Sequence, residues 1–526
     1  MTWSERFSTP SVAAIARHLS RVGIPLLLLF VLVQMAHAQI SPVPGFDPQR
    51  VTSVYAEALA FMAPRTLDPV PVSQLAIWGL RGLTALDPAL MTVVADGRLR
   101  LTCQSRTLFE TTVPKDDTPV AWANTAAAMA GAAYALSGAI RRVGNEGIIQ
   151  SFFDELFNHL DPYSRYVAPE EAGEDRARRA GRAGLGMTVA QRGSAVVVRD
   201  VIRDSPAAAI GLQPGDVLVA IDKQSLRGMA AASVAAMIAG PEETNVLIGW
   251  RGKDGRLREA LAERAMVPPE TVFVARMADL IVIRVTGFSR TTDTHLAHAL
   301  EDALMASRPV EGIVLDLRGN RGGLLRQAVS AADTLLPPGL VAMTAGRAPA
   351  ANAVWRSTAG QVGRDIPVVV IVDGRTASAA EVRAAALADR GRGVVIGSST
   401  LGKGLVQTID PLPDGGELYV TWSRILAPLG WPIHDLGVLP QVCTSRGQDV
   451  LRRQLGFLAE GTQIMTREIR AHRSARAPLT PQQVLTIRNA CPAAEGRDGD
   501  MEAARVLIAN PAAYAAALLP PMPEAR

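Results

Sequence analysis

One lysine and one serine, 25 residues apart in this chain, could together perform nucleophilic catalysis. Lys403 lies between two glycines and is followed by an apolar segment, which is a setting in which a side chain becomes buried. Burial disfavours the charged ammonium and lowers the pKa, and a neutral lysine can act as a general base. Ser378 would be the nucleophile that such a base activates. The alternative is a turn lysine whose neighbouring glycines only shape the turn.

Lysine is scarce in this chain, so this interpretation has few competitors. Of the 54 basic residues only four are lysines, and the other three, Lys115, Lys223 and Lys253, lie in polar sequences typical of exposed turns. Any reaction that needs a deprotonable amine therefore points to Lys403.

The sequence around Ser378 suits a nucleophile. It follows an apolar strand candidate at 368–373 and starts a helix, where free backbone N–H groups favour developing negative charge. Its alanine neighbours leave room for a substrate chain, although an N-capping serine is the structural alternative. A glycine-rich stretch at 317–324 could turn further amides toward a ligand, but alone it is a generic α/β turn.

Other chemistries lack essential groups. Residues 397–404 nearly match a phosphate-binding loop, but Gly404 stands where a hydroxyl must hold Mg²⁺, and a strand follows instead of a helix. His295 and His298 share a helix without the glutamate of a zinc motif, and no Gly-x-Ser-x-Gly sequence exists. We therefore expect no metal and no cofactor.

Three sections of chain must position these groups. Residues 39–180 are mainly helical in pattern, and 184–265 are β-rich with two short helices. In 271–442, β-branched strands alternate with helices, which predicts an α/β layer with a largely parallel sheet. The strand candidates are 280–285, 312–317, 368–373 and 393–396, and the helix candidates are 292–305, 324–335 and 377–388. Residues 443–526 are an Arg- and Gln-rich helical extension without assignable chemistry.

Residues 1–38 have the pattern of a secretory signal peptide. Arg17 and Arg21 precede an apolar run at 24–33, and Ala-His-Ala at 36–38 is a cleavage site. We expect cleavage and a periplasmic or otherwise exported protein, with a retained membrane anchor as the alternative. Residues 120–140 are uncharged but rich in alanine and glycine, which favours a packed helix over a membrane span.

Charge and cysteine content narrow the function classes further. A net charge of +4 from 54 basic and 50 acidic residues is too balanced to indicate nucleic acid or an acidic membrane surface as a partner. In an exported protein Cys443 and Cys491 are close enough in sequence to pair, leaving Cys103 alone. Three unpaired buried thiols are the alternative.

Several motifs, in chain order, resemble those of the C-terminal processing peptidases, also called tail-specific proteases. Residues 160–166 look like the family's Leu-Asp-Pro-x-Ser-x-Tyr motif, 184–187 like its carboxylate-binding loop, and 205–216 like its PDZ signature. Residues 315–323 match its glycine loop, and 437–440 match a late structural motif. Ser378, Lys403 and Gln407 have the family's Ser…Lys-x₃-Gln spacing. Departures at Thr376, Ala380, Arg321 and Leu401 concern the shape of the substrate subsites.

The resemblance implies an α/β multidomain protein and a serine endopeptidase that cleaves proteins near their C-termini. Its crotonase-like catalytic core would be 271–442, with an inserted PDZ domain at 184–265 and a helical N-terminal region at 39–180. Ser378 and Lys403 would form a catalytic dyad, with Gln407 orienting Lys403. The amides of Ala379 and Gly323, with Gly322 as the alternative, would form the oxyanion hole.

In the PDZ domain, amides around Leu185, Gly186 and Met187 would hold the carboxylate of a substrate's C-terminal tail. The partners are thus protein or peptide substrates and, as a further option, an adaptor protein. Two other classes compete with this interpretation. One is a catalytically inactive PDZ-bearing scaffold, and the other is a crotonase-like acyl-group enzyme, for which no acyl-CoA site can be located.

Overall fold

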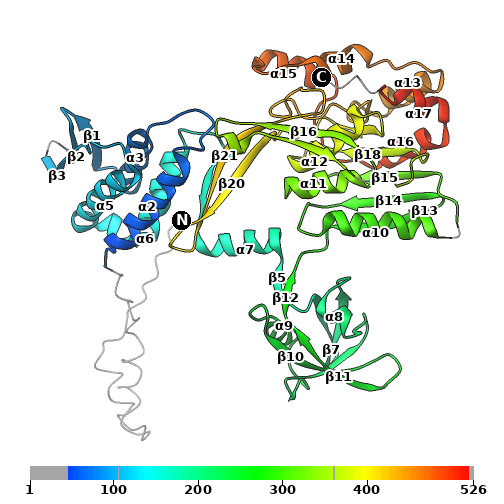
Figure 1. Cartoon of the computed structure of the whole chain (residues 1–526), viewed down its shortest axis with the longest axis horizontal. Coiled ribbons are helices and arrows are strands. Elements are labelled where there is room, and N and C mark those ends of the chain that lie inside the picture. Colours follow the sequence, from blue (N-terminus) through cyan, green and yellow to red (C-terminus); the bar gives the residue numbers. More distant parts are fainter. Residues whose placement is uncertain (1–44, 105, 307, 359–361, 521–526) are drawn as a thin grey trace, which may run out of the picture.

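The structure, a computed structural model, describes residues 45–104, 106–306, 308–358 and 362–520 (Figure 1). The predicted signal peptide lies outside these residues. Within them, no helix combines the length and the apolar character needed to cross a membrane. The uncharged segment at 120–140 lies mainly in α5 (Pro119–Leu136), a packed helix whose Trp122 and Ala126 are buried.

The N-terminal unit is helical with one small sheet. Its helices are α2 (Pro48–Met62), α3 (Val72–Leu80), α4 (Gly82–Leu86), α5 and α6 (Gly138–Phe157). The sequence did not indicate the antiparallel meander of β1 (Leu90–Ala95), β2 (Arg98–Cys103) and β3 (Arg106–Thr112) between α4 and α5. The available signal was Asp96-Gly97, where both residues have positive φ, as in the tight turns that join hairpin strands.

A two-stranded ribbon connects a β-rich unit to the rest of the chain (Figure 1). Strands β5 (Arg182–Gly184) and β12 (Ala265–Val267) pair antiparallel where the chain enters and leaves this unit. Its sheet has the order β11-β10-β8-β7-β6, with β9 paired to β8. The elements are β6 (Met187–Arg192), β7 (Ala195–Val201), α8 (Pro206–Ala209), β8 (Val217–Ile221), β9 (Gln224–Ser225), α9 (Ala231–Ile238), β10 (Asn245–Arg251) and β11 (Leu257–Glu263).

A six-stranded sheet forms the centre of the largest unit. Its order is β13-β14-β15-β18-β19-β22, and all neighbours are parallel except β13 and β14. The strands are β13 (Val272–Met277), β14 (Leu280–Val285), β15 (Gly312–Asp316), β18 (Val368–Val372), β19 (Val394–Gly397) and β22 (Val442–Cys443). The strands expected from sequence lie within one residue of these bounds. Helices α10 (Thr292–Met305), α11 (Leu325–Asp333) and α12 (Ala379–Asp389) follow three of the strands.

The C-terminal extension completes the core of this sheet. A parallel sheet must be covered on both faces. Alternate strand residues pack with α11 and α12 in one apolar cluster, and the residues between them, such as Val314 and Ile371, pack with Leu451 and Leu507 of the extension in another. Its helices are α13 (Gln448–Ala459), α14 (Thr466–Ser474), α15 (Pro481–Arg488), α16 (Asp498–Ala509) and α17 (Pro511–Ala517). The C-terminal extension, to which the sequence assigned no chemistry, therefore forms one layer of the core.

A second, antiparallel sheet connects this core to the N-terminal unit (Figure 1). Its order is β17-β16-β21-β20, and β4 (Arg165–Val167) pairs with β21. Leu418 and Val420 of β21 are buried in the N-terminal core, while Ile425 of the same strand is buried in the apolar cluster between the six-stranded sheet and α11 and α12. The remaining elements are α7 (Pro169–Ala180), β16 (Gly339–Ala345), β17 (Ala353–Ser357), β20 (Leu405–Pro411) and β21 (Glu417–Leu426).

We expect the buried His472 to make the fold acid-sensitive. Burial lowers the pKa of His472 from 6.5 to about 4, and its Nε2 lies 2.8 Å from the carbonyl oxygen of Gly437. The unfolded chain therefore binds more protons between these values, so stability is full above pH 6.5 and falls as the pH drops toward 4. The unfolding free energy should fall by about 2 kcal/mol from pH 7.5 to 5, as measured by denaturant unfolding. His472→Gln should flatten this slope, and an unaltered slope in this variant would contradict the assignment.

Candidate active site

The predicted nucleophile Ser378 lies in a tight turn between β18 and α12. Its φ of 57° is in the left-handed region, which a non-glycine residue occupies only where the surrounding structure holds it. The hydroxyl of the fully buried Thr376 donates to the carbonyl oxygen of Leu317 at 2.9 Å. The amide of Ala377 donates to the carbonyl oxygen of Asn320 at 2.9 Å. These bonds fix the nucleophile turn against the glycine loop that follows β15.

A buried carboxylate joins the serine to the lysine. Glu381, in the first turn of α12, is completely buried. One of its oxygens accepts the amides of Ser378 at 2.7 Å and Lys403 at 2.9 Å. The other accepts the amide of Gly402 at 2.7 Å and the hydroxyl of Thr400. Because one atom accepts both amides, the backbones of the two predicted catalytic residues are close neighbours. Burial raises the pKa of Glu381, and the four donors oppose that rise.

The environment of Lys403 agrees with its predicted role as a base. Its side chain is partly buried, and Nζ lies 4.7 Å from the centroid of the Tyr163 ring. Burial, and secondarily the charge of Arg165, lowers the pKa of Lys403, while Asp161 and Glu381 act in the opposite direction. A lowered pKa increases the neutral fraction that can accept a proton at a given pH.

Gln407 belongs to a polar network on the β20–β21 hairpin. Its side-chain amide donates to the hydroxyl oxygen of Thr421 at 3.1 Å, and that hydroxyl donates to Asp161 at 2.7 Å. The amide of Thr421 donates to the hydroxyl oxygen of Ser164 at 2.9 Å. The motif at 160–166 is therefore hydrogen-bonded to β21, the strand that pairs with β20, which carries Gln407. Among the described residues no hydrogen bond joins Gln407 to Lys403, so its orienting role stays a prediction.

The glycine loop lies against the nucleophile. Gly322 has a φ of 96°, and a Cβ added there would lie 2.8 Å from the Cβ of Ser378, so only glycine fits. The amide of Gly322 donates to the side chain of Asn320 at 2.8 Å. Within the described part of the chain, the amides of Gly323 and Ala379 donate to no other group. Gly323 is thus better placed than Gly322 to serve with Ala379, and the oxyanion hole remains a prediction.

The structure brings the backbones of Ser378 and Lys403 together, but their side chains are not hydrogen-bonded to each other in the described residues. Catalytic bonds of this kind often tighten only when substrate binds. Reasoning from sequence missed Glu381, Tyr163 and Thr421. For Glu381 a signal existed, because a glutamate three residues after a helix-starting serine has the spacing of a capping box.

The predicted tail-binding residues line a cavity of about 370 Å³. Leu185, Gly186 and Met187 lie along one part of it, and Ala235 and Ile238 of α9 contribute apolar surface. A cavity of about 270 Å³ beside the hairpin is lined by Asp161, Ser164, Leu405 and Thr421, among others. A larger cavity of about 690 Å³, between β13 and α10, contains none of the predicted site residues.

Two protein-family models match the chain. The one described as peptidase family S41 matches residues 279–444, a span that includes Ser378, Lys403 and Gln407. The one described as PDZ domain matches residues 197–252, which lie in the β-rich unit.

Individual relatives extend over more of the chain. A carboxy-terminal-processing protease of Bartonella bacilliformis is 32% identical over 305 residues, which are 57% of this chain and 70% of that protein. The carboxy-terminal processing protease CtpA of Bacillus subtilis is 32% identical over 302 residues, 56% of this chain and 62% of that protein. Among solved structures, the photosystem II D1 C-terminal processing protease is 26% identical with a TM-score of 0.34, covering 70% of this chain and 92% of that one.

Fold and sequence together define a serine-type peptidase that carries a PDZ domain. The chain belongs to the family of carboxy-terminal processing proteases, within peptidase family S41. The family and the α/β multidomain fold class predicted from sequence are thereby confirmed.

We expect Glu381→Gln to lower kcat by about 100-fold. The carboxamide would place N–H groups against backbone donors, which separates the Ser378 turn from the Lys403 loop, and small displacements of catalytic groups are costly. The measurement is peptide hydrolysis well below the thermal midpoint of the variant. Glu460→Gln, at an exposed helix end, is the matched control, and equal kcat in both variants would contradict a positioning role for Glu381.

Proposed function

We propose that this chain is an exported serine endopeptidase that cleaves protein substrates near their C-termini, with Ser378 as nucleophile and Lys403 as general base. The observation that carries the proposal is the single Glu381 oxygen that accepts the amides of both residues. Because of this shared acceptor, the strained backbone of Ser378 lies next to that of Lys403. Burial lowers the pKa of the Lys403 side chain. A scaffold that had lost activity would not need this arrangement.

The proposed reaction follows from these groups. Neutral Lys403 takes the proton of the Ser378 hydroxyl, and the alkoxide attacks the carbonyl carbon of a peptide bond. The amides of Ala379 and Gly323 stabilise the oxyanion that forms. The protonated lysine then gives its proton to the departing amine, leaving an acyl-enzyme. Water, deprotonated by the same lysine, hydrolyses this ester and regenerates Ser378.

Substrate choice is assigned to the PDZ domain, which we place at residues 184–265 beside a protease domain at 271–442. An extended tail would add as a strand beside β6, with its carboxylate near Leu185, Gly186 and Met187 and its apolar side chains against α9. The printed names of the relatives describe carboxy-terminal processing by those proteins. We extend that activity to this chain because the tail-binding cavity and the dyad occur together.

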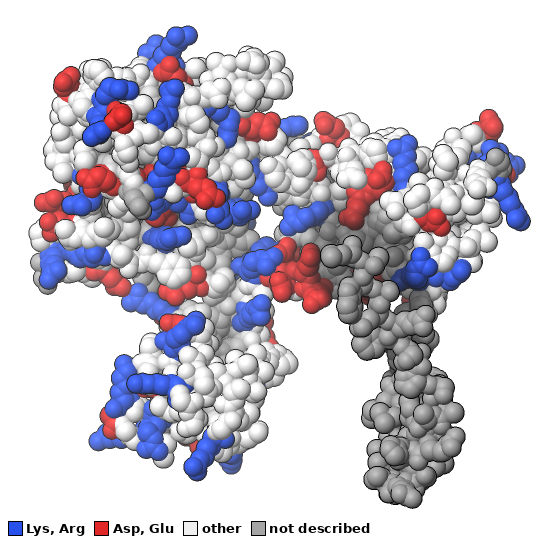
Figure 2. Space-filling view, turned by 180° about the vertical axis from the view of Figure 1, so that it is seen from behind, with Lys and Arg blue, Asp and Glu red and all other residues white. Residues whose placement is uncertain are grey.

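Export is supported by the signal-like sequence and by a disulfide between Cys443 and Cys491, since disulfides persist in oxidising compartments. Figure 2 shows basic and acidic side chains interspersed over the larger unit on the face in view, without one continuous basic surface. This distribution suits recognition of protein tails through backbone and carboxylate groups rather than through bulk charge.

Ser378→Ala should abolish hydrolysis of a tailed peptide, with kcat at least about 1,000-fold lower, because the attacking oxygen is gone. Lys403→Arg should be almost as damaging although it keeps the charge, since arginine stays protonated. Both variants are assayed by mass spectrometry of the products. Lys253→Arg in an exposed turn is the matched control. Wild-type turnover by Ser378→Ala would refute the proposed nucleophile.

Converting a substrate's C-terminal carboxylate to an amide should weaken processing by about tenfold, because the amides of the PDZ loop then lose a charged acceptor. The loss should appear in KM more than in kcat, since the change lies in the tail and not at the cleaved bond. Equal kcat/KM for the acid and amide forms of one peptide would argue against recognition of the tail.

A further inference from the structure

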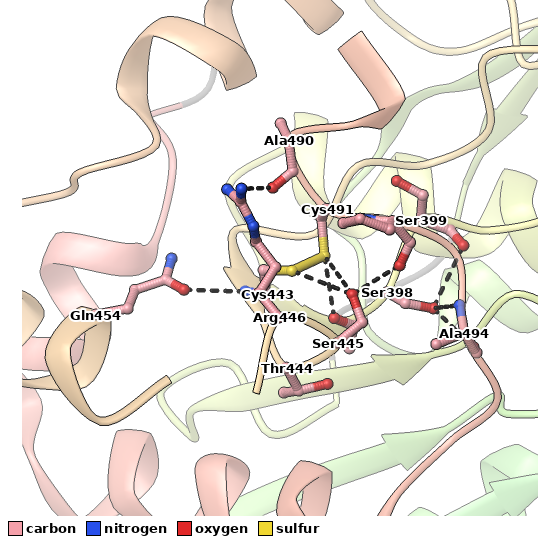
Figure 3. The surroundings of a disulfide bond; sticks show 12 residues. Ser398, Ser399, Cys443, Thr444, Ser445, Arg446, Gln454, Ala490, Cys491 and Ala494 are labelled. Carbon is pink, nitrogen blue, oxygen red and sulfur yellow. Dashed lines mark hydrogen bonds between the residues drawn. A yellow bond between two sulfur atoms is a disulfide. The ribbon is translucent and has the colours of Figure 1, made fainter. Parts of the chain in front are cut away.

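The segment that leaves α15 runs beside both catalytic loops. Helix α15 ends at Arg488 and α16 begins at Asp498. We call residues 491–497, which lie between these helices, the C-terminal strap. The peptidase family model ends at residue 444, so the strap lies outside it. Figure 3 shows the first part of the strap next to Ser398 and Ser399.

The strap is hydrogen-bonded to the turn that carries the nucleophile. The amide of Gly374 donates to the carbonyl oxygen of Ala494 at 2.7 Å. The amide of Gly496 donates to one carboxylate oxygen of Asp373 at 3.2 Å. The other oxygen of Asp373 accepts the amide of Thr376 at 3.0 Å, two residues before the nucleophile. The strap is therefore continuous with the network that holds this turn.

The strap is also hydrogen-bonded to the loop that carries the base. The amide of Ser399 donates to the carbonyl oxygen of Cys491 at 3.3 Å. The hydroxyl of Ser398 donates to the carbonyl oxygen of Ala494 at 2.9 Å, and the amide of Ala494 donates back to that hydroxyl at 3.1 Å. From Ser399 the loop continues through the donors to Glu381 and reaches the lysine. One residue, Ala494, thus contacts both catalytic loops.

A disulfide fixes the start of the strap. Cys443, at the end of β22, is bonded to Cys491, and the two residues are 2% and 0% exposed. Strand β22 pairs with β19, which leads into the lysine loop. Figure 3 shows the disulfide next to the two serines of that loop. The remaining cysteine, Cys103, is free and lies in the N-terminal unit.

We propose that the C-terminal strap, closed by the Cys443–Cys491 disulfide, is a positioning element of the catalytic site that sets the placement of the Ser378 turn relative to the Lys403 loop. The proposal rests on the proposed function of these two residues. They are not hydrogen-bonded to each other in the described structure, so their relative placement depends on the groups that hold both loops. Those groups are Glu381 within α12, the bond from the amide of Leu401 to the carbonyl oxygen of Thr376 at 2.9 Å, and the strap.

Loss of the cross-link should affect the chemical step and leave tail binding unchanged. The strap would then be held by hydrogen bonds alone, and the two loops would sample a wider range of separations. Proton transfer and attack depend steeply on such distances, so kcat falls. The PDZ cavity is built from other elements, so KM and tail affinity are retained.

The test is the double variant Cys443→Ala/Cys491→Ala in the full chain, with Cys103→Ala as the matched control. We expect the double variant to lose at least about tenfold in kcat on a tailed peptide, with KM within about twofold of wild type. Binding of a non-cleavable tail peptide should be unchanged, and the control should match wild type in every measurement. Wild-type kcat in the double variant, or a parallel loss of kcat and tail binding, would overturn the proposal.

A second variant keeps the test decisive if the double variant does not fold. Ser398→Ala retains the disulfide and removes two strap hydrogen bonds, and it should lower kcat in the same direction. Unchanged kcat in Ser398→Ala would then contradict the proposal. If Ser378→Ala proves as active as wild type, the proposed function fails independently of any result with the strap.

Reduction of the wild-type protein with a dithiol gives a third measurement. The dithiol passes two electrons and two protons to the disulfide, yielding two cysteine thiols and the cyclic disulfide of the reagent. Because both cysteines are buried, reduction should be slow, and kcat should fall at the rate at which two new thiols become titratable. Full kcat after complete reduction would overturn the proposal.

Discussion

The arrangement of this protease depends on one buried carboxylate. Glu381 has no contact with solvent, and four donors converge on it, one from Ser378 and three from residues 400–403. A buried carboxylate without partners is strongly unfavourable, so the donors and the acceptor hold each other in place. The strained backbone of Ser378 and the glycine-flanked turn of Lys403 are both stabilised by this shared acceptor. The predicted catalytic groups lie on loops, and their backbones acquire a defined geometry because one residue of a helix accepts hydrogen bonds from both loops.

The C-terminal extension has a comparable role on a larger scale. It covers one face of the parallel sheet, and its strap contacts the turns that follow β18 and β19. Functional residues of α/β sheets commonly lie in such turns at the carboxyl ends of the strands. The layer that completes the core therefore also borders the loops that carry Ser378 and Lys403.

The sequence predicted the parallel strands well because apolar β-branched runs such as 368–372 have few alternatives to a buried strand. It also singled out Ser378 and Lys403, whose amides share one Glu381 oxygen, because they occur with Gln407 at a recognisable spacing; the catalytic roles of all three stay a prediction. It did not reveal the role of Glu381, because the capping-box spacing indicates a helix start but not the burial of the carboxylate or its partners in residues 400–403. The antiparallel sheet was largely missed, since β16 and β21 obtain their partners from distant parts of the chain. The role of the extension depended on tertiary packing, which periodicity within helices does not specify.

The hairpin that carries Gln407 has a consequence for biosynthesis. Leu418 and Val420 are buried among N-terminal residues such as Phe153, which the ribosome makes more than 250 residues earlier. The N-terminal helices therefore emerge with part of their apolar surface uncovered and complete their core only when β21 arrives. The layer behind the central sheet is made later still. The loops that carry Ser378 and Lys403 thus obtain their last hydrogen-bond partners only after Ala494, 91 residues beyond Lys403, has been made.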